Sequence, residues 1–206
     1  SEVGRIYGYD NLKSTQPLLA ETHGGYSEKE TAMRRIKDIV QGQGMMEAIS
    51  YSLTSPEKAI SFTKDPKPVV EVQWPLNSSR STMRENLLTG LVDAASYNMA
   101  RKQKELALFE QGRVYDHENN TFNEHEHLAA LYSGHTVSAN WQHLDQKIDF
   151  YFVKGQLTNL FRAIGIKDTD IEYRPEIIVG MHPTRTAGIY LNDQYVGLIG
   201  MIAHTV

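Results

Sequence analysis

Short polar turns separate the strand-like segments of this chain, and this spacing limits the kind of sheet that they can form. The segments "TAGIYLN" and "YVGLIGMI" meet at residues 192–194, a connection that predicts a hairpin. Residues 106–115 likewise return through the polar residues 116–127 to the strand-like residues 128–134. Short turns join antiparallel neighbours, whereas parallel strands need long crossovers. We therefore expect an α+β fold in which helices flank an antiparallel β-sheet.

Three longer helices are expected to cover this sheet. Ser27 and Glu30 form a capping-box pattern before the first helix, in which each side chain satisfies the other residue's backbone N–H. Apolar residues then recur at three- and four-residue spacing, which indicates one apolar stripe. Thr82 and Glu85 repeat the capping pattern before a second helix, and a third is expected over about residues 149–163. Further strands are predicted at residues 47–53 and 69–74.

Composition narrows the function classes. The 206 residues carry a formal net charge of −4, with a pI near 6.1, whereas a domain that holds nucleic acid by phosphate contacts is expected to be basic. The absence of cysteine excludes disulfides and thiolate metal sites. No apolar run approaches the roughly 20 residues of a membrane span, and no signal peptide opens the chain. We therefore expect a soluble, cytoplasmic protein.

The first 25 residues differ in character from the rest of the chain. The opening "EVGRIYGYDN" resembles the last turns of a helix, and residues 17–25 read as an extended linker. We expect residues 1–25 to be the tail of a preceding domain with its linker. Residues 26–206 are expected to form one module that is truncated at its C-terminal end.

Polar clusters offer candidate sites. His125 and His127 would share one face of a strand, so a metal there is conceivable, although a solvated hairpin turn is the simpler interpretation. His182 and Arg185 flank a Pro-fixed turn that could position an anion, or they could tie that loop to a neighbouring strand. The chain contains no Walker-type glycine loop, no dinucleotide-binding glycine motif and no G-x-S-x-G motif.

Glu110 and Arg113 lie within "LALFEQGRVY", a segment that begins with four apolar residues. Three positions apart on a strand, the two side chains face opposite sides and cannot pair with each other. Because a buried charge must be paired, each needs a partner on another element or a place near solvent. This strand is therefore either the floor of an active site or the remains of one.

The order of these elements resembles the antiparallel catalytic fold of class II aminoacyl-tRNA synthetases. More narrowly, it is similar to the bacterial-type phenylalanine–tRNA ligase beta subunits. The resemblance covers nearly the whole chain, at ordered spacing. It is carried by the segments "EVGRIYGYDN", "PLNSSRSTMRENLLTGLVDAASYN", "LALFEQGRVY", "IDFYFVKGQLTNLFRAIG" and "HPTRTAGIYLNDQYVGLIG".

This resemblance implies a module that has lost its catalytic groups. In active class II enzymes the matching strand carries an Arg just before the Glu, to hold the ATP α-phosphate. Here Leu108 and Phe109 precede Glu110, and "YVGLIGMIAHTV" offers no arginine for the other end of the nucleotide. Adenylation depends on positive charge held around the triphosphate and magnesium. We therefore expect no catalytic residue, and a vestigial cleft that comprises Glu110, Arg113, His182 and Arg185.

The resemblance also implies partners and cofactors. A catalytic alpha subunit would pair with this module through the helix that follows Ser27, in the place of the class II dimer-forming motif. Glu2 matches one residue of a Glu-Glu pair that binds magnesium in the family, but Ser1 replaces the other. ATP and magnesium are expected for the whole enzyme and no cofactor for this chain. The candidate interface residues, which could also pack only on their own sheet, are Met33, Ile36, Ile39 and Val40.

The leading hypothesis is a non-catalytic structural domain that scaffolds the alpha subunit in a heterotetramer attaching phenylalanine to tRNA. One alternative is an autonomous class II-like ligase that activates another carboxylic acid. Its available phosphate ligands would be Arg113, Arg162 or Arg185. A second alternative is a tRNA-binding module that uses the basic cluster Arg101, Lys102 and Lys104, although a helix C-terminus also explains positive charge there.

Overall fold

The computed structural model describes residues 1–19, 23–137, 141 and 145–203. The chain divides into two compact units, Ser1–Ala32 and Met33–Val206. The predicted boundary after residue 25 lies within the first unit, which contains helix α1 (Glu2–Tyr7) and a 3-10 turn at Tyr9–Asn11. Helix α2 (Glu28–Gly42) begins in the first unit and continues into the second.

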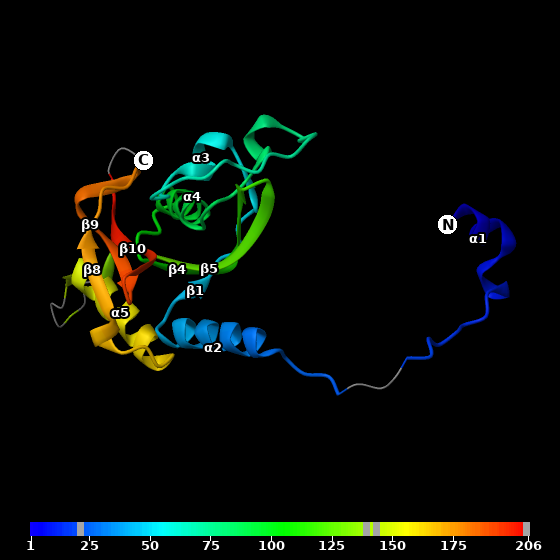
Figure 1. The fold of residues 1–206 in the computed structure, drawn as a ribbon, viewed down its shortest axis with the longest axis horizontal. Coiled ribbons are helices and arrows are strands. Elements are labelled where there is room, and N and C mark those ends of the chain that lie inside the picture. The colour runs from blue at the N-terminus through cyan, green and yellow to red at the C-terminus, as the bar shows by residue number, and fades with distance from the viewer. Residues whose placement is uncertain (20–22, 138–140, 142–144, 204–206) are drawn as a thin grey trace. The chain divides into compact units, whose positions relative to one another are not determined.

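The second unit is α+β, and its sheets are mostly antiparallel (Figure 1), which confirms the expected fold class. One three-stranded sheet has the order β1-β4-β5, and a second has the order β10-β9-β8. The pair β1–β4 is parallel, which the sequence did not predict. The strands are β1 (Met46–Glu47), β4 (Leu106–Glu118), β5 (Thr121–Ser133), β8 (Ile171–Pro175), β9 (Met181–Leu191) and β10 (Gln194–Ile202). Two small pairs join β2 (Leu53–Thr54) to β3 (Thr82–Met83) and β6 (His135–Val137) to β7 (Gln146–Lys147).

The polar segment 116–127, predicted as a turn, forms the outer ends of two long strands instead. The ladder between β4 and β5 runs without a break from Leu106↔Ser133 to Glu118↔Thr121. Only Asn119 and Asn120 form the turn, with φ values of 51° and 60°. Asparagine tolerates this left-handed backbone, which matches the twist of a two-residue hairpin. The charged and polar residues of this segment therefore belong to a solvent-exposed strand pair and not to a loop.

Two of the three predicted helices begin where the sequence indicated. At α2, the Ser27 N–H donates to the Glu30 carboxylate at 2.8 Å and the Glu30 N–H donates to Ser27 Oγ at 3.2 Å, which confirms the capping box. Helix α5 (Phe150–Ala163) is capped by Asp149, whose carboxylate accepts from the Phe152 N–H at 2.8 Å. Both helices thus start at side chains that satisfy free N–H groups.

The predicted start of the second helix at Thr82 was wrong. Residues 82–83 form strand β3, and helix α4 begins only at Leu88, where the Asn86 side chain accepts from the Thr89 N–H at 3.3 Å. Thr82 is instead buried and paired with Thr54 across β2–β3. Tertiary pairing of this segment therefore prevailed over a local capping pattern.

The strands predicted at 47–53 and 69–74 are largely absent from the described structure. Only the short strands β1 and β2 form around the first segment, and a short helix α3 (Pro56–Ile60) follows. In the second, Glu71 makes a single isolated bridge with Thr82. Prolines lie on both sides of it, at positions 66, 68 and 75, and a residue without an N–H cannot extend a ladder.

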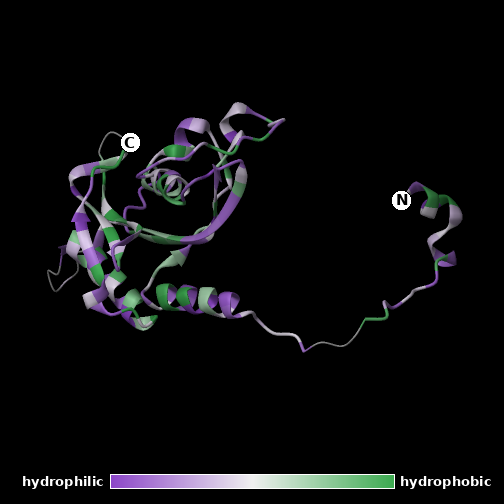
Figure 2. Ribbon diagram, in the orientation of Figure 1, coloured by the Kyte–Doolittle hydropathy of each residue, from purple (hydrophilic) through white to green (hydrophobic). Residues whose placement is uncertain are grey.

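The core lies on both faces of the β1-β4-β5 sheet, as Figure 1 shows for α4 and for the helices opposite it. On one face, Phe109 is fully buried with Val40 of α2 and Leu160 of α5. On the other, Leu91 and Ala95 of α4 pack with Leu131. Figure 2 shows hydrophobic and hydrophilic residues alternating along α2, as expected for a helix with one buried stripe. No helix of the described residues is long and apolar enough to cross a membrane.

Candidate functional site

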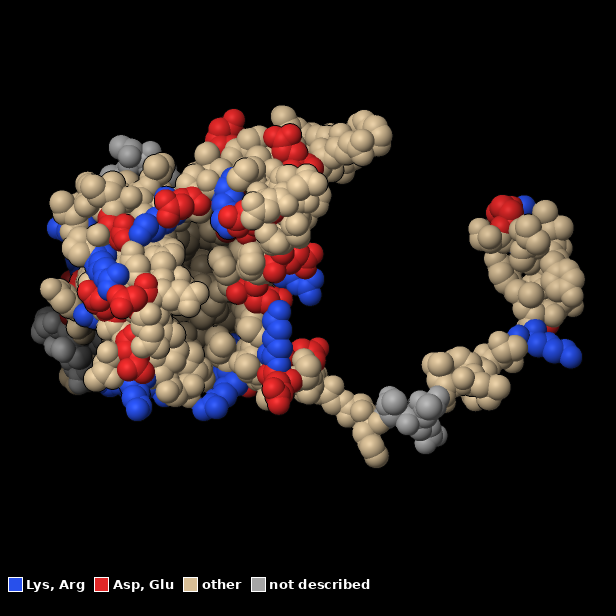
Figure 3. All heavy atoms as spheres, in the orientation of Figure 1, with Lys and Arg blue, Asp and Glu red and all other residues tan. Residues whose placement is uncertain are grey.

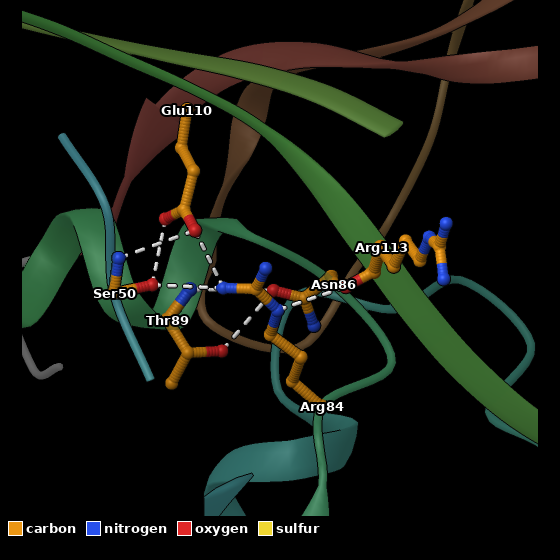
Figure 4. A network of polar contacts seen from close by, with 6 residues as sticks. All are labelled: Ser50, Arg84, Asn86, Thr89, Glu110 and Arg113. Carbon is orange, nitrogen blue, oxygen red and sulfur yellow. Dashed lines mark hydrogen bonds and ion pairs between the residues drawn. The ribbon is translucent and has the colours of Figure 1, made fainter. Parts of the chain in front are cut away.

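The most buried polar group of the sheet is the carboxylate of Glu110 on β4, with an exposed fraction of 2%. Arg84, which follows β3, is also buried, and its Nη1 donates to Glu110 Oε1 at 2.6 Å. Ser50 completes the network: its hydroxyl donates to Glu110 Oε2 at 2.6 Å and its N–H donates to Oε1 at 3.2 Å (Figure 4). The network therefore joins three segments that are far apart in the chain.

Arg84 is fixed at both ends of its guanidinium group. Its Nε donates to the backbone carbonyl of Arg113 at 3.0 Å, while Nη1 also donates to Ser50 Oγ at 2.9 Å. Gly112 allows this approach, because a Cβ at that position would come within 2.6 Å of Arg84 Nη2. A buried ion pair with its remaining groups hydrogen-bonded is stable only as a complete set. The Glu110 carboxylate thus holds the Arg84 guanidinium in the interior of the protein.

An open pocket of about 280 Å³ lies beside this network, and the cations that line it are already engaged. Lys58 Nζ lies 2.7 Å from Asp93 Oδ1, and Arg84 is paired with Glu110. The Arg80 guanidinium carbon lies 3.7 Å from the centroid of the Tyr51 ring. A triphosphate site requires several cations aimed into one cavity. Two of the three cations here are neutralised by acids of the same chain, so the pocket lacks that arrangement.

The four residues predicted to form the vestigial cleft lie on two different sheets. Arg113 projects from the opposite side of β4 to Glu110 (Figure 4), as predicted, and pairs with Glu124 at 2.9 Å and Glu126 at 3.2 Å on β5. On β9, His182 Nδ1 accepts from the Thr184 N–H at 3.3 Å, and Arg185 Nη1 lies 3.5 Å from the sulfur of Met201. In the described structure, no hydrogen bond or ion pair connects the β4 residues to the β9 residues.

Arg84 and Ser50 are the site residues that sequence reasoning missed. The sequence did indicate that Glu110 needs a partner, because a buried carboxylate cannot remain unpaired. It did not identify that partner, since the capping pattern at Thr82 placed Arg84 in the first turn of a helix. Backbone hydrogen bonds on both sides place Arg84 over β4: its N–H donates to the Ser52 carbonyl, and its carbonyl accepts from the Tyr115 N–H of β4.

The groups considered for metal binding have other partners. The Glu2 carboxylate accepts from Arg5 Nε at 2.9 Å, and His125 Nε2 lies 3.0 Å from Asp116 Oδ2. The part of the chain that the structure describes contains no group of three or more histidines or acids that could hold a metal ion. The donor groups of the described residues therefore do not fit a magnesium ion.

The residues named for the two alternative functions are largely engaged within the chain. Arg162 pairs with Asp168, as Arg113 does with its two glutamates. Arg101 stacks on Tyr97, with its guanidinium carbon 3.3 Å from the ring centroid. On the face shown in Figure 3, basic and acidic side chains of the described residues are interspersed. Arg113 and Arg162 are thus bound by acids of the chain, and the described residues on the face in Figure 3 show no broad basic surface.

Much of the predicted interface stripe of α2 packs on its own sheet. Val40 is buried in the core, and Ile36 and Ile39 pack against the same cluster. Met33 is half-buried, and its carbonyl accepts from Gln111 Nε2 at 3.2 Å. Two apolar side chains in the segment that follows this helix are exposed, Met46 (67%) and Ile49 (88%).

A family model described as "Phenylalanyl tRNA synthetase beta chain CLM domain" matches residues 12–206. The chain belongs to this family. It is 93% identical, over its whole length, to the phenylalanine–tRNA ligase beta subunit of Lactobacillus johnsonii, and 37% identical over 98% of its length to that of Streptococcus pyogenes serotype M1. The chain spans 26% and 25% of the lengths of these two relatives, respectively.

Solved structures with low sequence identity share the fold of this beta-chain domain. A pyrrolysyl-tRNA synthetase of Desulfitobacterium hafniense, PylSc, matches with a TM-score of 0.57 and 16% identity, over 86% of this chain and 60% of that chain. An ATP phosphoribosyltransferase regulatory subunit/histidyl-tRNA synthetase from Bacillus halodurans matches with a TM-score of 0.53 and 14% identity, over 78% and 42% respectively. The fold is that of class II aminoacyl-tRNA synthetases, as the sequence predicted.

Proposed function

We propose that this chain is the non-catalytic, class II-like module of a phenylalanine–tRNA ligase beta subunit. In this proposal it scaffolds the catalytic alpha subunit within a cytoplasmic heterotetramer that attaches phenylalanine to tRNA. The family match and the names of the relatives support this assignment. The need for ATP and magnesium then belongs to the assembled enzyme, and the alpha subunit supplies the groups that bind them.

The main support for the non-catalytic role is that the side chains of strand β4 are buried in the core or paired within the chain. Phe109 is buried in the core, and Glu110 is bound to Arg84 and Ser50. Leu108 packs with the cluster under α4. The residues at which the family's active relatives would present a phosphate-binding arginine are thus committed to packing in this chain. In this proposal the strand contributes to the core and does not take part in a reaction.

Pyrophosphate exchange tests the claim that the chain is non-catalytic. The purified chain is mixed with ATP, magnesium and phenylalanine, and exchange of labelled pyrophosphate into ATP is followed with and without the alpha subunit. Background exchange with the chain alone is expected, because two of the three cations that line the described pocket, Lys58 and Arg84, are paired with acids. Exchange above background in the absence of alpha subunit would refute the non-catalytic role.

We also propose that the segment after α2 contacts the alpha subunit. Met46 and Ile49 are exposed, and exposed apolar side chains that lie together can mark a protein–protein contact. The chain is expected to co-elute with the alpha subunit in size-exclusion chromatography. Ile49→Asp should weaken this association at least about tenfold, the effect of losing about 1.4 kcal/mol. Ile177→Asp, an equally exposed isoleucine elsewhere, is the matched control. Equal weakening by both variants would exclude this surface.

A further inference from the structure

The ammonium group of Lys64 lies among the Glu176 carboxylate, the Tyr190 hydroxyl and the Tyr195 ring. Its Nζ donates to Glu176 Oε1 at 2.6 Å and to the Tyr190 hydroxyl at 2.8 Å. The same nitrogen lies 4.9 Å from the centroid of the Tyr195 ring. Aromatic faces attract a cation through their quadrupole, most strongly where it is partly desolvated. Lys64 is partly buried, with 26% of its side chain exposed.

The groups around Lys64 also contact one another. The Tyr190 hydroxyl donates to Glu176 Oε1 at 2.6 Å, and the Tyr190 and Tyr195 rings meet edge to face with centroids 5.6 Å apart. Tyr190 and Tyr195 come from the paired strands β9 and β10, where they lie directly opposite each other, and Glu176 directly follows β8. These three groups thus belong to one sheet and are preorganised as a set.

Lys64 comes from a different part of the chain, in the segment that follows α3, 112 positions before Glu176. It also lines an open pocket of about 300 Å³ beside the loop that contains Ile177 and Val179. Shortening the Lys64 side chain would therefore open the set of three acceptor groups to this pocket. A small ligand from solvent could then reach them.

We propose that Glu176, Tyr190 and Tyr195 form an ammonium-binding site whose resident occupant is the side chain of Lys64. The emptied site takes small primary ammonium ligands. Hydrogen bonding from Lys64 lowers the pKa of Glu176 most, and the hydrogen bond from Tyr190, which does not involve Lys64, lowers it as well. In the intact chain the tethered ammonium fastens the segment after α3 onto the β8-β9-β10 sheet. This site goes beyond the proposed scaffolding function and does not depend on it.

The test is chemical rescue of Lys64→Ala. Propylammonium supplies the three carbons and the nitrogen that this substitution removes, and 1-propanol is its neutral counterpart. The Tm of Lys64→Ala should fall by about 2–6 °C, the range for a modest loss in a chain of this size. Propylammonium should restore at least half of this loss with a half-saturating concentration on the order of 1–10 mM, as for a ligand of four heavy atoms. 1-Propanol should restore none.

Two matched variants complete the test. Lys58→Ala removes an exposed lysine that pairs with Asp93 at 2.7 Å, so propylammonium should leave its Tm unchanged. Lys64→Met fills the space without the charge, and it too should not respond. If Lys64→Ala does not fold, its refolding yield in propylammonium against 1-propanol gives the same comparison. The proposal is overturned if propylammonium has no saturable effect on Lys64→Ala, or if it acts equally on Lys58→Ala.

Discussion

Glu110 is a buried carboxylate whose charge is balanced within the chain, by Arg84 and a serine hydroxyl. Removing one partner of such a pair leaves an uncompensated charge in the core, whereas replacing both partners by apolar groups can be nearly neutral. A variant that lacks one partner therefore measures the cost of breaking the pair, and a variant that lacks both measures what the intact pair contributes.

We expect Arg84→Met to lower the free energy of unfolding by about 3–5 kcal/mol, because Glu110 would remain buried and unpaired. The double variant Arg84→Met, Glu110→Leu should recover much of that loss. Chemical denaturation measures both. Arg113→Ala is the control: its ion pairs are exposed to solvent, so it should destabilise the chain far less than Arg84→Met. A larger cost for Arg113→Ala than for Arg84→Met would contradict this assignment of the buried pair.

Glu85 is a second buried carboxyl group, with an exposed fraction of 8%, and its Oε1 has no hydrogen-bond partner among the described residues. Burial raises its pKa from 4.5 to about 7, and the nearby Asp116 adds to this effect, while the Lys67 N–H and ammonium oppose it. The folded state therefore binds the proton more tightly than the unfolded state. Its contribution to stability is complete below pH 4.5 and is lost as the pH rises through 7.

The free energy of unfolding should thus fall by up to about 3 kcal/mol between pH 4.5 and 8 from this group alone, since each pKa unit corresponds to about 1.36 kcal/mol. Glu85→Gln, which mimics the protonated form, should remove this part of the pH dependence. Urea denaturation at several pH values measures it, with the exposed Glu71→Gln as control. Parallel pH profiles for the wild type and Glu85→Gln would show that Glu85 does not titrate in this range.

At the scale of elements, the sequence predicted those that depend on local chemistry. The capping groups Ser27 and Asp149 lie at the starts of α2 and α5, and the hairpin between β9 and β10 turns at Asn192 and Asp193. The elements that depend on distant partners were missed. The segment around Thr82 was read as a helix cap because its strand partner, 28 positions earlier at Thr54, leaves no local trace in the sequence.

The capping box of α2 gives a local prediction. Ser27→Ala removes the hydroxyl that accepts from the Glu30 N–H, which should destabilise the first turn by about 0.5–2 kcal/mol. Amide hydrogen exchange of residues 28–31 should accelerate accordingly. Exchange in α5 should not change, because that helix has its own cap at Asp149. Unchanged exchange at residues 28–31 would show that the box does not hold the helix start.

At the scale of the whole molecule, the chain is a beta-subunit module that covers about a quarter of the length of its relatives. Its fold could be predicted because the order of its helices and hairpins resembles that of a known family over nearly the whole chain. The state of its cleft could be predicted only in part. The apolar side chains before Glu110 indicated a missing arginine, but the arginine that neutralises Glu110 became visible only when β3 was placed beside β4.

The central claim is that, among the described residues, the pocket beside Glu110 lacks the set of unpaired cations that would hold a nucleotide triphosphate. Calorimetric titration of the purified chain with ATP and magnesium tests it most directly. We predict no saturable heat of binding at millimolar nucleotide, because Arg84 and Lys58 are paired with acids of the same chain. A micromolar dissociation constant for ATP would contradict the account.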